Sequence, residues 1–186
     1  MGTHLGRGRG GTVIVEPYDP EWLLRYRGQA ALLEVALAHR ITAIEHIGST
    51  AIPGLSAKPV IDLAACADSG VDPFSLEPLI ESLGYRQHRS GPKTHAVYTR
   101  GSGAGRTDIL HVFTASAWPT CNQRVFRDKL EHDEDARRRY GELKIRLAAT
   151  EMSGMDYTAA KLDLIQELLD EERASRGLPL GSAWEK

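Results

Sequence analysis

The apolar segment VIDLAAC, at residues 60–66, contains a single charged residue, Asp62. A short segment that is apolar on both faces is typical of an interior strand in a covered sheet. An ionised carboxylate in such a strand is costly unless a partner, a metal or a ligand compensates it. Asp62 therefore indicates either a satisfied structural aspartate or a charged site at one end of a covered sheet.

The segments before this strand predict a strand, a helix and a further strand. TVIVEPYD (residues 12–19) begins as a strand, and Asp19 with Pro20 predicts the start of a helix that runs to about residue 39. AIEHI (43–47) predicts a strand that enters a turn at Gly48 and Ser49. Residues 50–59 contain prolines and a glycine, and they predict a loop.

The segments after it predict a helix, a hairpin and a helical C-terminal part. SLEPLIESLGY (75–85) predicts a helix ending at Gly84, and HAVYTR (95–100) with TDILHVF (107–113) predict an antiparallel hairpin around GSGAG. Helices are expected over residues 122–132, 133–150 and 156–176, with Asp133 and Asp156 as N-caps. This order predicts an α/β or α+β fold, a sheet with helices packed against it.

Length, charge and cysteine content limit the class of protein to which this chain can belong. The 186 residues suit one domain, expected over residues 13–176 between a flexible segment (1–12) and a tail (177–186). The net charge of −2 argues against a general nucleic-acid binder, and no apolar run is long enough to span a membrane. The start has no apolar core of a secretory signal, and Cys66 and Cys121 have no zinc-type spacing. A cytoplasmic protein is expected.

The turn before Asp62 is suited to binding an anion. Gly48 allows a ligand to approach the backbone, while Ser49 and Thr50 supply hydroxyl and N–H groups. A Gly-Ser turn followed, after such a spacer, by an aspartate in an apolar strand is similar to the signature of the nucleotidyltransferase superfamily. In that superfamily the turn holds nucleotide phosphates and strand carboxylates hold divalent metal.

A longer stretch, IEHIGSTAIPGLSAKPVIDL, resembles the defining segment of the GrpB family, a branch of that superfamily. Further similar motifs follow the same order: PYDPEW near the start, LGYR, LHVF, FRDKL, YGELK and YTAAK. The resemblance covers about residues 13–170. It implies a nucleotidyltransferase-like mixed β-sheet with added C-terminal helices. Some members are fused to dephospho-CoA kinase, which suggests nucleotide or coenzyme chemistry.

The resemblance also implies site residues. Asp62 and Asp108 are the candidate catalytic and metal-binding carboxylates, with Mg²⁺ or Mn²⁺ as the cofactor. Alternatively, Asp108 is an ordinary residue at the start of a strand. His46 is alternatively a hydrogen-bonded residue that supports the fold. Active relatives carry a second carboxylate two residues after the first. In this chain that position is Ala64. Candidates for binding substrate or phosphate are Gly48, Ser49, Thr50, Lys58, His111, Arg124, Arg127, Lys144 and Lys161.

Two functions of different classes follow from these residues. The first is a metal-assisted transferase of the nucleotidyltransferase type, which binds a nucleotide or another phosphorylated donor and acts on an unknown acceptor. The second is a catalytically silent accessory or regulatory protein that binds a nucleotide, coenzyme or acidic metabolite. Ala64 favours the second function. Neither requires a membrane or a nucleic-acid partner.

Overall fold

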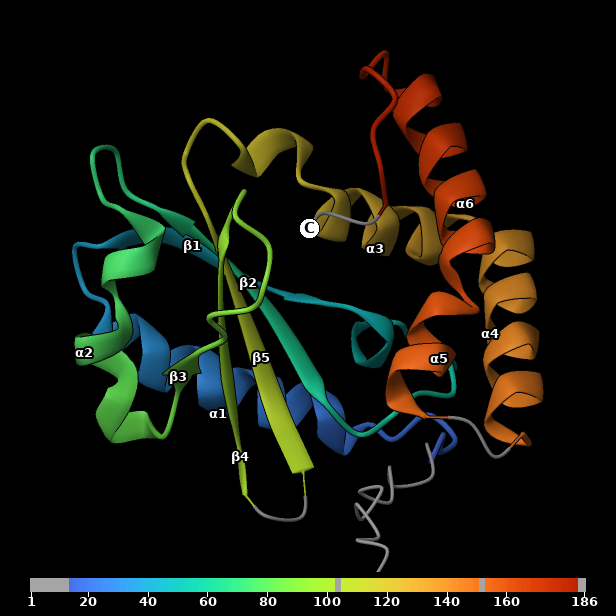
Figure 1. Ribbon diagram of the computed structural model, residues 1–186, viewed down its shortest axis with the longest axis horizontal. Helices are drawn as coiled ribbons and strands as arrows, with labels where there is room; N and C mark the ends of the chain where they lie inside the picture. The colour runs from blue at the N-terminus through green and yellow to red at the C-terminus, as the bar shows by residue number, and fades with distance from the viewer. Residues whose placement is uncertain (1–13, 103–104, 151–152, 184–186) are drawn as a thin grey trace, which may run out of the picture.

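The computed structural model describes residues 14–102, 105–150 and 153–183. The segment predicted to be flexible, residues 1–12, lies outside the described residues. The described part forms one mixed sheet with helices on its faces and a helical C-terminal part, so the fold class predicted from the sequence is confirmed (Figure 1).

The sheet has five strands in the order β1-β2-β5-β4-β3. The β2 and β5 strands are parallel, and the other neighbouring pairs are antiparallel. Because β2 is hydrogen-bonded on both sides, the apolar segment is an interior strand, as its sequence predicted. The strands are β1 (Ile41–Ile47), β2 (Ile61–Ala67), β3 (Arg86–Gln87), β4 (Ala96–Ser102) and β5 (Gly105–Phe113).

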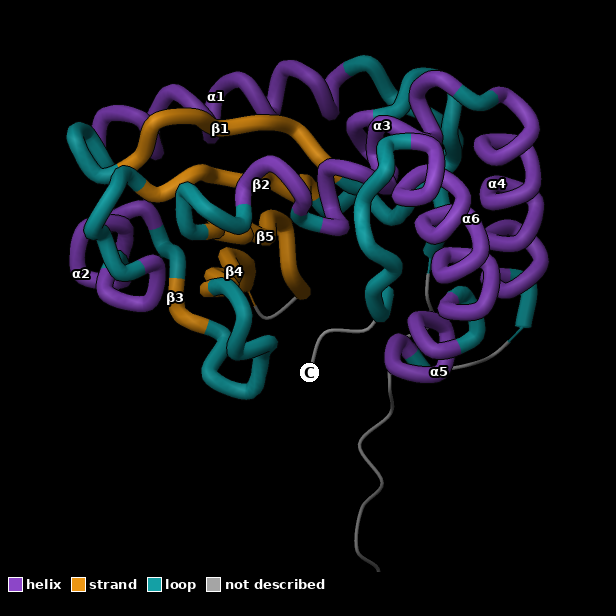
Figure 2. The backbone as a smooth tube through the Cα atoms, turned by 90° about the horizontal axis from the view of Figure 1, so that it is seen from above, coloured by secondary structure: helices purple, strands orange, loops and turns teal. Residues whose placement is uncertain are grey.

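The helices form two groups (Figures 1 and 2). The first group lies against one face of the sheet, and the second gathers beyond the end of the sheet where β2 begins. The first group is α1 (Glu21–Ala36) and α2 (Glu77–Ile80); the second is α3 (Asn122–His132), α4 (Glu134–Ala148), α5 (Gly154–Ala159) and α6 (Leu162–Ser175).

Separate apolar clusters hold these two groups. On one face of the sheet, Trp22 and Leu33 of α1 pack against Leu63 of β2 and Leu110 of β5. A second cluster joins the loop before β2 to the C-terminal helices; it contains Ile52, Leu55, Leu130, Ala136, Tyr140 and Leu168. The second cluster fixes the position of α4 beside the turn that precedes β2.

The structure corrects several predicted boundaries. The described part of the first predicted strand makes only an isolated bridge between Glu16 and Ala57. The last predicted helix is two helices, α5 and α6, and Ser153 rather than Asp156 caps α5. Asp133 caps α4 as predicted, since its side chain accepts the N–H of Ala136.

Candidate functional site

Gly48 and Asp62 lie against each other where β1 ends and β2 begins. Gly48 has φ +69°, a conformation that few side-chain-bearing residues adopt, and a Cβ at this position would lie 2.9 Å from Cβ of Asp62 and overlap its carboxylate. The tight turn therefore brings its backbone directly against the Asp62 side chain. The turn and the aspartate form one site.

The two hydroxyl residues of the turn point to different surroundings. The Ser49 side chain lies near the Tyr140 hydroxyl on α4, and it lowers the pKa of Tyr140 against the larger effect of burial. Thr50 is buried: its Oγ1 donates to the Val60 carbonyl at 3.2 Å and accepts from Nε2 of His46 at 3.0 Å. Ser49 therefore faces the site, whereas the Thr50 side chain stabilises the turn.

His46 belongs to the framework of the fold. Its ring stacks on Tyr26 of α1, with 4.6 Å between centroids. Burial, with a smaller contribution from Arg127, lowers its pKa to about 4, so the ring is neutral at ordinary pH. The structure thus agrees with the framework reading of His46.

Asp62 lies among lysines. The carboxylate is partly buried, and desolvation raises its pKa to about 7, although the positive charges of Lys161 and Lys58 oppose this shift. Desolvation also lowers the pKa of Lys161 to about 8, while Asp62 acts in the opposite direction. The Lys161 ammonium lies 4.4 Å from the centroid of the Tyr157 ring. Asp62 therefore lies beside the Gly48 turn and within reach of the positive charges of Lys161 and Lys58.

Lys144 adds a buried positive charge behind Lys161. It is 2% exposed, its Nζ donates to the Ser56 carbonyl, and it lies 4.8 Å from the centroid of the Tyr140 ring. Desolvation and then repulsion by Lys161 lower its pKa to about 7. Among the described residues, neither Lys58, Lys144 nor Lys161 has a carboxylate within ion-pair distance. We call Asp62 with these three lysines the lysine cluster.

Asp108 does not join the lysine cluster. It is in register with Ile61, whereas Asp62 is in register with Ile109, so the two carboxylates point to opposite faces of the sheet. Its Oδ2 accepts hydrogen bonds from Arg100 Nε at 2.9 Å and from Thr107 at 2.6 Å. The expectation that Asp62 and Asp108 share a cation is therefore wrong, because strand alternation separates them.

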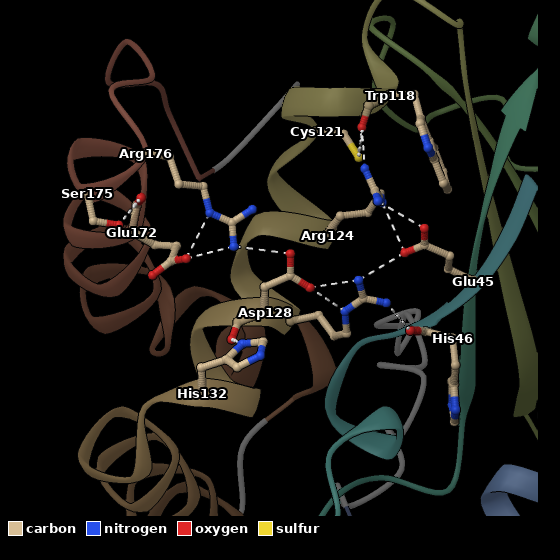
Figure 3. A network of polar contacts seen from close by, with 11 residues as sticks. Glu45, His46, Trp118, Cys121, Arg124, Asp128, His132, Glu172, Ser175 and Arg176 are labelled. Carbon is tan, nitrogen blue, oxygen red and sulfur yellow. Dashed lines mark hydrogen bonds and ion pairs between the residues drawn. The ribbon is translucent and has the colours of Figure 1, made fainter.

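Arg124 and Arg127 form a different network (Figure 3). Both guanidinium groups contact Glu45 at 2.9 Å, and Arg127 also donates to the His46 carbonyl at 3.0 Å. Asp128 accepts from Arg127 at 2.7 Å. Both arginines were candidates for binding phosphate, but their charges are matched by carboxylates. They join α3 to the end of β1 instead of facing the lysine cluster.

His111 shares a face with Asp62 but has another partner. It is in register with Ala64, and its Nδ1 lies 3.0 Å from Nε2 of His95. His95 lines a cavity of about 390 Å³ together with Cys121, away from the lysine cluster. The structure therefore groups His111 with His95.

Two aromatic residues, Tyr140 and Tyr157, lie beside the lysines of the site. Tyr140 is buried, and desolvation raises its pKa. Tyr157 is also buried, and its pKa rises to about 12 for the same reason. Both belong to motifs, YGELK and YTAAK, in which the lysine draws attention first. The four-residue spacing of each Tyr-Lys pair, one helical turn, was the available signal.

These side chains do not fit a metal centre built from paired carboxylates. Position 64 is alanine, Asp108 points away, and the charges with the largest effects on Asp62 are those of Lys161 and Lys58. Over the described ranges, no three His, Cys, Asp or Glu side chains are grouped so that they could hold a metal ion. Asp62 alone would contribute one oxygen ligand group to a hard cation.

The fold and the site define an α/β protein with a mixed five-stranded sheet and a cationic site where an interior strand begins. The chain belongs to the GrpB family, whose model, described as GrpB protein, matches residues 12–171. It is 34% identical to UPF0157 protein PA4798 of Pseudomonas aeruginosa, over 90% of this chain and 71% of that protein. It is 31% identical to the glutamate-rich protein GrpB of Alkalihalophilus pseudofirmus, over 87% of this chain and 96% of that protein.

A solved structure has the same fold. The crystal structure of conserved protein GrpB from Enterococcus faecalis matches with a TM-score of 0.78 and 25% identity, over 88% of this chain and 99% of that one. No helix in the described part of the chain combines the length and apolarity needed to cross a membrane.

Proposed function

We propose that this protein binds a phosphorylated small molecule at the turn formed by residues 48–50, with a nucleotide or nucleotide-containing coenzyme as the ligand class. The observation that supports this proposal best is the charge of the lysine cluster. Lys161 and Lys58 act on the Asp62 carboxylate and Lys144 acts on Lys161; Lys144 and Lys161 have lowered pKa values because they are desolvated. A phosphate dianion would offset this surplus of positive charge.

Each residue has a defined part in this proposal. Lys161 and Lys58 contact the phosphate, and Ser49 donates its hydroxyl. Gly48 lets the turn lie directly against Asp62 because it has no Cβ. Lys144 remains behind Lys161 and contributes charge. Asp62 accepts a hydrogen bond from a ligand hydroxyl.

A metal-assisted transferase is the second candidate. The observation that favours it is the contact of Asp62 with the Gly48 turn, the arrangement in which related transferases hold a metal and a nucleotide phosphate. Asp62 would contribute the metal ligand, and Mg²⁺ or Mn²⁺ would neutralise phosphate charge. The donor set lacks the second carboxylate, so binding without catalysis is the function we prefer.

Calorimetry with ADP in the presence of EDTA tests the proposal. We expect the protein to bind ADP without added metal, and Lys161→Met to weaken binding at least tenfold, which is about 1.4 kcal/mol. Lys93→Met is the matched control, since Lys93 is exposed and lies outside the lysine cluster. Equal affinities for the wild type and Lys161→Met, or no binding of ADP, CoA or pyrophosphate, would contradict the proposal.

A further inference from the structure

Helix α1 is apolar on two opposite sides. Its inner side carries Trp22 and Leu33, which are buried against the sheet. Its outer side carries a second apolar row at the spacing of one helical face. We call this row the α1 stripe: Leu24, Gly28, Ala31, Leu32 and Val35, all of them exposed. Figure 2 shows α1 along the outside of the molecule, with its outer side not covered by any described element.

The α1 stripe concentrates exposed apolar surface. Val35 is 81% exposed, Leu24 54% and Leu32 49%. Single exposed apolar residues are ordinary on protein surfaces, but a continuous apolar row marks an interaction site. Of the nine large apolar residues exposed in the described part of the chain, four are on α1, because Leu23 adds to the three named above.

Gly28 in the middle of the stripe points to a helical partner. A glycine inside a helix costs about 0.5–1 kcal/mol relative to alanine. A Cβ at Gly28 would meet no atom within 4 Å, so packing within this chain does not require a glycine there. A small residue at the centre of an apolar helix face allows the backbone of a second helix to approach closely.

The charged residues beside the stripe favour a second copy of α1 as the partner. Arg27 and Glu34 are both exposed, and they lie seven positions apart on the same flank of the stripe. Neither forms an ion pair with another described residue. If a second α1 packs against the first in the opposite direction, Arg27 of each copy faces Glu34 of the other. A parallel pair would not bring Arg27 of one copy beside Glu34 of the other.

We propose that the α1 stripe is a homodimer interface in which the α1 helices of two copies pack antiparallel. A helix of 16 residues is about 24 Å long, so this contact alone is smaller than the roughly 800 Å² per partner of a standard interface. The dimer is therefore weak and depends on protein concentration.

Sedimentation velocity over a range of protein concentrations tests this inference. The wild type should show a monomer–dimer equilibrium, and Val35→Arg should raise the dimer dissociation constant at least tenfold. Ile145→Arg is the matched control: Ile145 is an exposed apolar residue on α4, at 55% exposure, and its replacement should leave the dimer unchanged. Circular dichroism would establish that each variant is folded.

A charge exchange tests the antiparallel arrangement. Arg27→Glu and Glu34→Arg should each weaken the dimer, and the double variant should restore it, since each new pair is again of opposite charge. A wild type that stays monomeric at millimolar concentration would overturn the proposal. A dimer that Val35→Arg leaves intact, or that the double variant fails to restore, would overturn it equally.

Discussion

Gly48 and Asp62 are in such close contact that any side chain on Gly48 would overlap the Asp62 carboxylate. The positive φ of Gly48 and this contact are separate requirements for glycine at the same position. They connect the turn that would receive a phosphate to the Asp62 carboxylate of the lysine cluster. The site therefore depends on a backbone contact as much as on charged side chains.

Replacing Gly48 and Gly54 in turn separates the cost of backbone strain from the cost of overlap with the Asp62 carboxylate. Gly48→Ala should lower the free energy of unfolding by about 3 kcal/mol, since it combines backbone strain with overlap. Gly54→Ala is the control, because Gly54 has φ +79° but open space around its Cβ position; strain alone should cost about 1–2 kcal/mol. Denaturant unfolding measures both, and equal costs would show that the contact with Asp62 is unimportant.

The stability of the protein should depend on pH through Asp62. Its folded pKa of about 7 lies above the ordinary value of 3.8, so between pH 4 and 7 the folded state binds more protons than the unfolded state. This group therefore makes the protein less stable as the pH rises through that range. The difference in unfolding free energy between the wild type and Asp62→Asn should fall from pH 4 to 7 and then level off. A flat difference would contradict the raised pKa.

The buried lysines should act in the opposite direction at higher pH. The folded pKa values of Lys144 (about 7) and Lys161 (about 8) lie below the ordinary 10.5. From pH 7 to 10 the unfolded state binds more protons, so these groups stabilise the protein as the pH rises. The gain over this range should shrink in Lys144→Met, as followed by denaturant unfolding. An unchanged gain would show that Lys144 is not desolvated.

Glu45 should support the fold without affecting the ligand. Glu45→Gln removes the charge that pairs with Arg124 and Arg127, so unfolding should become easier by about 1–2 kcal/mol. Affinity for ADP should stay the same, because this network joins α3 to β1 away from the lysine cluster. A tenfold loss of affinity in a folded variant would mean that Arg124 and Arg127 belong to the binding site.

Asp108 offers a second test of which residues belong to the binding site. Asp108→Asn removes the buried negative charge that pairs with Arg100, so it should lower stability by about 2 kcal/mol. Calorimetry with ADP, with and without Mn²⁺, should give the wild-type affinity. A specific loss of the Mn²⁺ effect would mean that Asp108 does hold metal in solution.

The sequence predicted the elements of the sheet better than the membership of the site. The apolar run around Asp62 indicated an interior strand, and the glycine-rich loop indicated the hairpin of β4 and β5. Asp108 was misplaced because its partner in the register is Ile61, and pairing between distant strands cannot be obtained from spacing along one strand. The break between α5 and α6 was missed because the residues around it are all good helix formers.

The central claim is that lysines, rather than a metal held by Asp62, bind the phosphate. The most direct measurement is the calorimetric affinity of Asp62→Asn for pyrophosphate at pH 7 in EDTA, beside the wild type and Lys161→Met. We predict that Asp62→Asn keeps the wild-type affinity within about threefold, while Lys161→Met loses at least tenfold, about 1.4 kcal/mol. Loss of binding in Asp62→Asn, or wild-type binding that requires Mg²⁺ or Mn²⁺, would contradict the claim.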